Sequence, residues 1–438
     1  MKLIINVHID NKNNNLVNIL FDDKIRKISE KDINISNCEI IDLKGKLLIP
    51  GCIDAHVHFN DPGYSHHEDF ISGTTAAAFG GITTIIDMPC TSIPPVTNVK
   101  NFRHKLEIVQ PKALVDFAFW GGIRQNDFPL NEKQITDLWN AGIVGFKIYT
   151  ISGMDSFEAL SYTQIAKTLK AFPEILFGFH AEDETIIKQN SVFRKTAENY
   201  AKIRSIEAEF TAVKNILNFS ENAKIHFVHI SSKKAAELIL QSENATFETC
   251  PHYLQFTADD LPKLRGKLKT APPVKFAEDR DFLRQCVHDE KVDFITTDHA
   301  GCDFKTEKDF ADFAKIYNGI PATELMIPFL FSEFYQKEKT NLAAMIKLTS
   351  ENAAKRFGIY PQKGSLQIGT DADFTVINLQ KASIVDETKL HSKGKYSPFD
   401  ETKFSCSIDR TIVRGKTIFD AEKGILQKAG CGKFIKRN

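Results

Sequence analysis

The stretch Asp54-Ala-His-Val-His58 is the part of the sequence whose residue types point most directly to chemistry. On a β-strand, residues i and i+2 point to the same side, so the imidazoles of His56 and His58 can bind one cation together. Pro50-Gly51 precedes the pair, and the turn Asn60-Asp-Pro-Gly63 follows it. Two strand histidines in ordinary polar contacts would give the same pattern, so the rest of the chain has to separate the two interpretations.

Further residues of ligand type stand at the ends of later β-rich runs, namely Lys147, His180, His229 and Asp298. In a barrel of parallel strands, all the C-terminal strand ends converge on one face, and catalysis takes place there. Chance does not account for so many such groups at one structural position. We therefore predict a metal centre on that face.

The elements that must position these groups follow a regular alternation from residue 52 onward. Short β-rich runs are separated by longer stretches, and the runs span 52–58, 83–87, 115–119, 143–147, 175–180, 225–229, 246–249 and 294–298. The segments 70–79 and 206–217 between them carry apolar residues at helical spacing. Eight strands alternating with helices predict an α/β fold, a closed (β/α)₈ TIM-type barrel, rather than an open sheet.

Both ends of the chain have a different rhythm. Residues 2–10 and 16–20 have the pattern of short strands, and strand patterns return within 363–377 and 410–420. We expect residues 1–51 and 361–438 to form together one small β-sandwich domain beside a barrel that spans residues 52–360. The basic residues Lys433, Lys436 and Arg437 are interpreted as a solvated terminus.

Composition excludes several classes of partner. Lys plus Arg and Asp plus Glu both number 56, so a zero net charge gives no reason to expect nucleic acid or an anionic membrane. No apolar run reaches the ~18–20 residues that span a bilayer, and the N-terminus lacks the features of a signal peptide. The 8 cysteines are scattered without a CxxC pair, which predicts reduced thiols and a cytoplasmic location.

The sequence resembles the dihydroorotase, allantoinase and dihydropyrimidinase branch of the amidohydrolase superfamily, the cyclic amidohydrolases, nearly from end to end. The matching stretches are 54–58, 73–84, 144–147, 180–182, 228–231, 248–253, 297–299 and 369–373. The resemblance implies a site for two divalent metal ions, expected to be Zn²⁺. Its ligands would be His56, His58, Lys147, His180, His229 and Asp298.

Lys147 needs a physical account, because an ammonium group cannot ligate a cation. The resemblance implies that CO₂ carboxylates this lysine to N6-carboxylysine, a carbamate whose two oxygens bridge the metals. A surface lysine at a strand end is the alternative. The apolar neighbours Phe146 and Ile148 favour a lysine held in the barrel wall.

The activity implied by the resemblance is hydrolysis of a carbon–nitrogen bond, other than a peptide bond, in a cyclic amide. A hydroxide bridging the metals would open the ring, since two cations lower the pKa of a bridging water toward ~7. Asp298 would be the catalytic residue that takes the proton and delivers it to the leaving ring nitrogen.

The choice of substrate depends on departures from each pattern within the branch. Dihydroorotases typically follow HxH with a hydrophobe and an arginine that pairs with the substrate carboxylate, whereas this chain has Phe59 and Asn60. Another cation, Lys275 or Lys269, would have to replace that arginine. The stretches 92–95, 119–122 and 269–273 resemble allantoinases more closely. We predict an allantoinase-like enzyme, with dihydroorotase as the alternative and a substituted hydantoin as an open possibility.

Several polar residues near the strand ends are candidates for contacts with the small cyclic amide. They are Asn60, Ser152, Gly153, His252, Thr270 and Asn318. The alternative for each is a side chain satisfied by water or backbone. His299 is expected to support the site, and His66 and His67 receive no role.

Two rival interpretations remain at this stage. Non-catalytic scaffolds of the superfamily lose the metal ligands, whereas this chain keeps them all. Deaminases of the superfamily generally use one metal and lack the lysine that Lys147 represents. The resemblance also implies a homo-oligomer, either a dimer or a tetramer.

Overall fold

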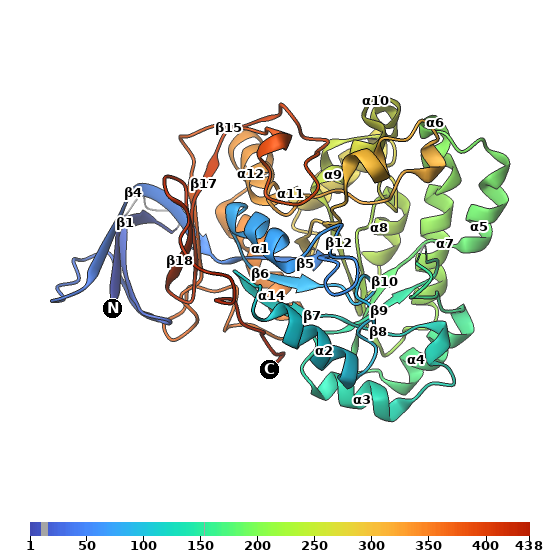
Figure 1. Ribbon diagram of the computed structural model, residues 1–438, viewed down its shortest axis with the longest axis horizontal. Helices are drawn as coiled ribbons and strands as arrows, with labels where there is room; N and C mark the ends of the chain where they lie inside the picture. The colour runs from blue at the N-terminus through green and yellow to red at the C-terminus, as the bar shows by residue number, and fades with distance from the viewer. Residues whose placement is uncertain (10–15, 153) are drawn as a thin grey trace.

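The computed structural model describes residues 1–9, 16–152 and 154–438. Its centre is a ring of parallel strands with helices around it, and a mixed β-sheet lies at one end (Figure 1). One parallel sheet consists of β5 (Cys52–Val57), β6 (Ile82–Asp87) and β7 (Asp116–Phe119). A second consists of β8 (Gly121–Gly122), β9 (Phe146–Tyr149), β10 (Leu176–His180), β11 (Lys224–Phe227), β12 (Ala245–Thr249) and β13 (Phe294–Ile295).

The ring is closed where its first and last strands meet. Val57 and His299 form a parallel bridge, and the amide of His58 donates to the carbonyl oxygen of His299 at 2.7 Å. On the other side, β8 follows β7 after a single residue. The predicted (β/α)₈ barrel is thereby confirmed.

The barrel strands are apolar runs because both of their faces are covered. All residues of β5, β6 and β10 are buried, as expected for parallel strands between a core and a layer of helices. The last predicted run, 294–298, is too long, since β13 ends at Ile295. Asp298 has a φ of 49°, a left-handed conformation that does not occur within a regular strand.

Helices cover the outside of the barrel (Figure 1). The two segments with helical spacing are confirmed as α1 (Phe70–Phe79), which begins at the N-cap Asp69, and α7 (Ile206–Leu217). The others are α2 (Val99–Val109), α3 (Glu132–Asn140), α4 (Tyr162–Ala171), α5 (Glu184–Gln189), α6 (Ala197–Ile203), α8 (Lys233–Ile239), α9 (Pro251–Gln255), α10 (Leu261–Leu264), α11 (Ala277–His288), α12 (Met326–Leu330), α13 (Leu342–Ile346) and α14 (Asn352–Arg356).

Both chain ends build the mixed sheet, which confirms the predicted small β domain. Its strand order is β19-β18-β17-β14-β4-β1-β2-β3. These strands are β1 (Lys2–His8), β2 (Val17–Phe21), β3 (Ile25–Ser29), β4 (Glu39–Pro50), β14 (Phe374–Asn378), β17 (Ser407–Val413), β18 (Lys416–Asp420) and β19 (Gly424–Ile425). The central pair joins β4 to β14, so the sheet needs both ends of the chain. The domain limits at residues 51 and 361 stay a prediction.

The C-terminal tail differs from the expected solvated terminus. Phe434 forms a parallel bridge with Phe117, and the amide of Ile435 donates to the carbonyl oxygen of Phe117 at 2.7 Å. Ile435 is buried in the same hydrophobic cluster as Trp120, and the Arg437 guanidinium lies 3.5 Å from the centre of the Trp139 ring. The basic charges had suggested solvation, but the apolar residues between them anchor the tail.

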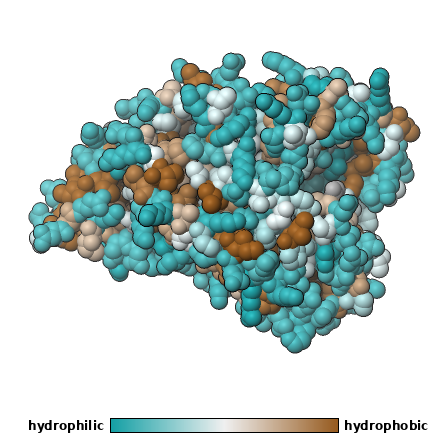
Figure 2. Space-filling view, in the orientation of Figure 1, coloured by the Kyte–Doolittle hydropathy of each residue, from teal (hydrophilic) through white to brown (hydrophobic). Residues whose placement is uncertain are grey.

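The face of the molecule in Figure 2 is mainly hydrophilic, and its hydrophobic side chains form separate patches rather than one continuous band. Among the described residues, no helix is long and apolar enough to span a bilayer.

Candidate active site

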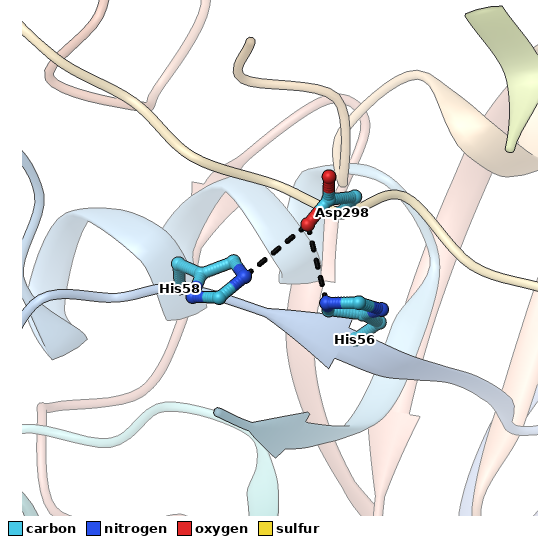
Figure 3. Close-up of side chains that lie close together, drawn as sticks. All are labelled: His56, His58 and Asp298. Atoms are coloured by element: carbon cyan, nitrogen blue, oxygen red, sulfur yellow. Dashed lines mark ion pairs between the residues drawn. The ribbon is translucent and has the colours of Figure 1, made fainter. Parts of the chain in front are cut away.

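His56 and His58, at the end of β5, meet Asp298 from the other side of the barrel closure (Figure 3). The Nε2 atoms of both histidines lie 3.2 Å from Oδ1 of Asp298. His56 is fully buried and His58 nearly so. The i, i+2 spacing therefore brings both rings to one carboxylate, as the sequence predicts. These three residues could hold one metal ion together.

A second pair of histidines lies beside this group. His180 ends β10, and its Nδ1 lies 3.1 Å from Nε2 of His229. The His229 ring is 5.3 Å from that of His56, centre to centre, so the two groups are neighbours. His229 has a φ of 43°, a left-handed conformation that turns the chain just after β11. Its side chain therefore does not follow the alternation that a strand would give it.

Lys147 lies in the barrel wall, as its apolar neighbours indicate. Its side chain is fully buried, and its Nζ has no hydrogen-bond partner among the described residues. The ammonium lies 4.9 Å from the centre of the Tyr149 ring. Burial lowers the pKa of Lys147 to about 8, which leaves much of the amine neutral near that pH.

The donor set fits a metal centre because it leaves buried polar atoms unsatisfied. His56 Nε2, Lys147 Nζ and His229 Nδ1 are all buried without a hydrogen bond in the described part of the chain. Each such atom costs ~1–3 kcal/mol when nothing compensates it. Imidazole nitrogens and carboxylate oxygens, grouped in this way, are the ligands that zinc-type cations prefer.

Two buried carboxylates set the orientation of the histidines. Glu248 accepts a hydrogen bond from His56 Nδ1 at 2.5 Å and another from His226 Nε2 at 3.0 Å. This arrangement leaves the His56 Nε2 lone pair facing Asp298. Burial alone would raise the pKa of Glu248, but the neighbouring His56 holds it well below its usual range. Sequence reasoning assigned Glu248 no role, although it lies within a stretch that matched the family.

Glu182 plays the same part for His180. It accepts from His180 Nε2 at 2.8 Å and from both Nε and Nη2 of Arg204. Burial opposes its ionisation, yet Arg204 keeps its pKa well below the usual range. A histidine that donates one ring nitrogen to a carboxylate has its other nitrogen free as a ligand.

Asp298 is ionised at neutral pH. Burial would raise its pKa, but His56 and His58 lower it to about 2. Opposite them, Cys90 Sγ lies 3.6 Å from His58 Nδ1 and 3.1 Å from the Tyr149 hydroxyl. Cys90 thus contacts both a predicted metal ligand and the Tyr149 hydroxyl.

A cavity of about 280 Å³ opens above these groups. Its lining includes His58, His180, His229 and Asp298, and also Ser152, Arg204, Tyr317 and Asn318. A larger, more open groove of about 760 Å³ lies beside it and shares Ser152 and Met154. The smaller cavity is the one that the predicted ligands border.

The predicted substrate contacts divide into two groups. Ser152 and Asn318 line the cavity, whereas Asn60, His252 and Thr270 are buried outside its lining. The side chains of Asn60 and His252 have no hydrogen-bond partner among the described residues. Thr270 donates its hydroxyl to the carbonyl oxygen of Pro272 at 2.8 Å. Gly153 lies outside the described residues.

The cations considered as carboxylate partners are engaged elsewhere. Lys269 Nζ donates to the carbonyl oxygens of Phe313 and Ile316, and Lys275 Nζ donates to that of Arg204. The arginine that does line the cavity, Arg204, was missed by sequence reasoning. In the sequence, Arg204 lies 24 residues after His180, which is too far for spacing alone to associate the two.

His299, which was expected to support the site, has its ring held by residues outside the cavity lining. Its Nε2 lies 3.1 Å from Glu68, and its Nδ1 accepts from the amides of Ala322 and Thr323 at 3.2 Å. Both ring nitrogens are thus engaged, and neither faces the cavity as a ligand.

Comparison with known proteins gives a consistent picture. The model of the amidohydrolase family matches residues 47–418. An allantoinase from Streptomyces avermitilis is 34% identical over 90% of this chain and 89% of its own. A dihydroorotase from Methanosphaera stadtmanae is 33% identical over 94% of both chains. Among solved structures, L-hydantoinase (dihydropyrimidinase) from Arthrobacter aurescens superposes with a TM-score of 0.92, at 31% identity over 99% of both chains.

Proposed function

Because this chain belongs to the amidohydrolase family, we propose that it is a metal-dependent cyclic amidohydrolase that opens the ring of allantoin or a close relative. The observation that carries this proposal is the convergence of the predicted ligands at the mouth of the barrel, where His58, His180, His229 and Asp298 line one cavity. His56 joins His58 and Asp298 in one group, and His180 and His229 form a second. Lys147 is close enough to His56, His229 and Asp298 for its charge to shift their pKa values.

The ligand set supports two divalent cations. Zn²⁺ is the expected metal because four of the six ligands are imidazoles, which zinc binds readily together with carboxylate oxygens. His56 and His58 would hold one ion, and His180 and His229 would hold the other. Asp298 and a carboxylated Lys147 would complete the set. When bound, the ions lower the pKa of a water molecule and polarise the carbonyl group of the substrate.

The chain's own residues carry the proton and fix the geometry. Asp298, ionised at neutral pH, accepts a proton from the water whose oxygen attacks the carbonyl carbon, and delivers it to the ring nitrogen as the bond between that nitrogen and the carbonyl carbon breaks. Glu248 and Glu182 hold the rings of His56 and His180 in one tautomer throughout. A cyclic substrate keeps its leaving nitrogen tethered to the product.

The positions considered as partners of a substrate carboxylate favour a ring without one. Asn60 occupies the sequence position at which dihydroorotases carry an arginine, and Lys269 and Lys275 are bound to carbonyl oxygens. Dihydroorotase is the second candidate, and one observation favours it. Arg204 lines the cavity, and no hydrogen bond engages its Nη1 among the described residues, so this nitrogen could meet a substrate carboxylate.

The test is ring opening by zinc-loaded protein in bicarbonate buffer, measured on allantoin, dihydroorotate, dihydrouracil and hydantoin. We expect allantoin to be turned over fastest. Preference for dihydroorotate would replace the leading proposal with the alternative and direct attention to Arg204. Failure to open any of the rings, with two metals bound, would contradict the proposal.

We further propose a cytoplasmic homo-oligomer, a dimer or tetramer, in line with the scattered reduced cysteines and the family resemblance. Light scattering on the purified protein would measure its oligomeric state. A monomer at micromolar concentration would contradict the proposed oligomer.

A further inference from the structure

Three side chains outside the active site converge between two loops. His66 and His67 belong to the loop after β5, and Glu307 belongs to the segment Phe304–Lys308. Their ligand atoms all lie within 4.8 Å of one another. His67 Nε2 is 2.5 Å from Glu307 Oε1, and the two imidazole rings are 4.1 Å apart, centre to centre.

This group differs from the other clusters of such residues in the described part of the chain. Asp116, Asp371 and Asp373 also converge. Lys363 Nζ lies within 2.9 Å of all three, so its ammonium already provides the positive charge that a metal ion would supply. The remaining cluster is the active-site group. Among the described residues, Glu307 has no lysine or arginine partner, and a second imidazole stands beside its histidine.

We propose that His66, His67 and Glu307 form a separate, solvent-accessible site for a transition-metal cation of the Zn²⁺ class at the rim of the cavity. Two imidazoles and a carboxylate suit Zn²⁺, Co²⁺, Ni²⁺ or Cu²⁺ rather than Mg²⁺ or Ca²⁺. Three protein ligands leave a coordination position open to water. It shares no ligand with the proposed catalytic centre.

The ligands are held ready for a cation. The Tyr64 ring is stacked on that of His67, with an interplanar angle of 8°, and Glu307 Oε2 accepts from the amide of Asp303 at 3.0 Å. Burial lowers the pKa of His67 and Glu307 raises it, while the adjacent His66 lowers it again. The net lowering favours the neutral ring that ligates a metal.

The site is connected to the cavity through Tyr317. Tyr317 lines the cavity, and the centre of its ring lies 5.2 Å from that of the His67 ring. The backbone amide of Tyr317 donates to the carbonyl oxygen of Glu307 at 2.9 Å. On the other side, the amide of Tyr64 donates to the carbonyl oxygen of Asn60. A cation bound by both loops therefore ties together two parts of the rim. Since loop motion limits turnover in many barrel enzymes, we expect excess metal to inhibit.

The first test measures binding, independently of activity. Protein with its buried site loaded with zinc, and freed of excess metal, is titrated with Zn²⁺ by calorimetry, and bound metal is counted by atomic emission. We expect one further equivalent in the wild type, and at least about tenfold weaker binding of it in His67→Gln and Glu307→Gln. His391→Gln is the matched control, because His391 pairs with Glu324 at 3.0 Å but belongs to no such cluster.

A double variant, His66→Ala with His67→Gln, completes the test. If it binds the further equivalent as the wild type does, the site is elsewhere and the proposal is wrong. Circular dichroism and melting temperature identify a variant that fails to fold, in which case Glu307→Gln alone decides.

The second test measures inhibition of ring opening by excess Zn²⁺. We expect inhibition of the wild type and of His391→Gln, and its loss in the double variant. Equal inhibition of all three would overturn the coupling to turnover. Should no ring be opened at all, the proposed function fails while the binding test still decides the metal site, so the two failures are distinguishable.

Discussion

Glu248 shows how strongly a residue outside the proposed ligand set can control it. It is fully buried, and it accepts hydrogen bonds from both His56 and His226. Because the hydrogen bond at His56 Nδ1 decides which ring nitrogen is free, the ligand's geometry depends on this carboxylate.

We therefore expect Glu248→Gln to lower metal affinity or activity by about 10–100-fold while the fold survives. A glutamine keeps the size but can accept only on one oxygen. Metal titration and kcat/KM measure the effect, and Glu278→Gln, at an exposed ion pair with Lys233, is the control. Unchanged affinity and activity would show that His56 is oriented by something else.

Lys147 supplies a prediction with a defined pH dependence. Only a neutral amine attacks CO₂, and the pKa of this lysine is lowered to about 8. Below that pH the ammonium form dominates, so carboxylation slows. At constant dissolved CO₂, recovery of activity by metal-free protein given zinc should speed up as the pH rises from 6.5 toward 8.5. A recovery rate independent of pH or of CO₂ would contradict the carboxylated lysine.

Among the elements, the C-terminal tail behaves as part of the barrel. Its backbone pairs with β7 at Phe117, and Ile435 is buried against the cluster that includes Trp120 and Val144. An apolar side chain near a terminus stabilises the fold only when it is removed from water, as Ile435 is.

Ile435→Ala should reduce the free energy of unfolding by about 2–5 kcal/mol. The cost comes from the lost burial of the side chain and from the cavity left in its hydrophobic cluster. Urea denaturation measures it, and Lys436→Ala, at an exposed position of the same tail, should stay within about 0.5 kcal/mol of the wild type. If the two variants are equally stable, the tail is not anchored.

At the scale of the whole molecule, Lys363 joins the barrel to the β domain. Its buried ammonium lies 2.5 Å from Asp116 of β7, 2.6 Å from Asp373 and 2.9 Å from Asp371, just before β14. Arg414, after β17, also pairs with Asp116 at 3.0 Å. One buried network thus spans both parts of the fold.

Lys363→Met should destabilise the protein by about 3–5 kcal/mol, because it removes the buried ammonium that three carboxylates share and leaves Asp373 without an ion pair among the described residues. Denaturation followed by fluorescence and by circular dichroism would measure the loss. Lys355→Met, at an exposed pair with Glu351, is the control. A change below about 1 kcal/mol would mean that the network contributes little to the junction.

Local sequence patterns were enough to predict the barrel, the helices at 70–79 and 206–217, and the positions of the HxH pair and His180 at the ends of their strands. Lys147 instead lies within β9, and His229 and Asp298 lie beyond the ends of β11 and β13. These features depend on local periodicity, since a strand repeats every two residues and a helix every 3.6. The HxH pair reaches one carboxylate for the same reason. The resemblance to the amidohydrolases added the roles of the ligands, which local patterns do not carry.

The residues that orient those ligands come from distant parts of the chain, and no local pattern identifies them. Glu248 is 192 residues from His56 in the sequence. Arg204 lines the cavity and donates a hydrogen bond to Glu182. Lys269 and Lys275 turn away from it, while Glu307 comes to His67 from a distant loop. Glu248 lies on β12, whereas Arg204, both lysines and Glu307 lie outside the barrel strands. In every case the contact joins segments far apart in the sequence, so it is set by the packing of the whole chain rather than by any local pattern.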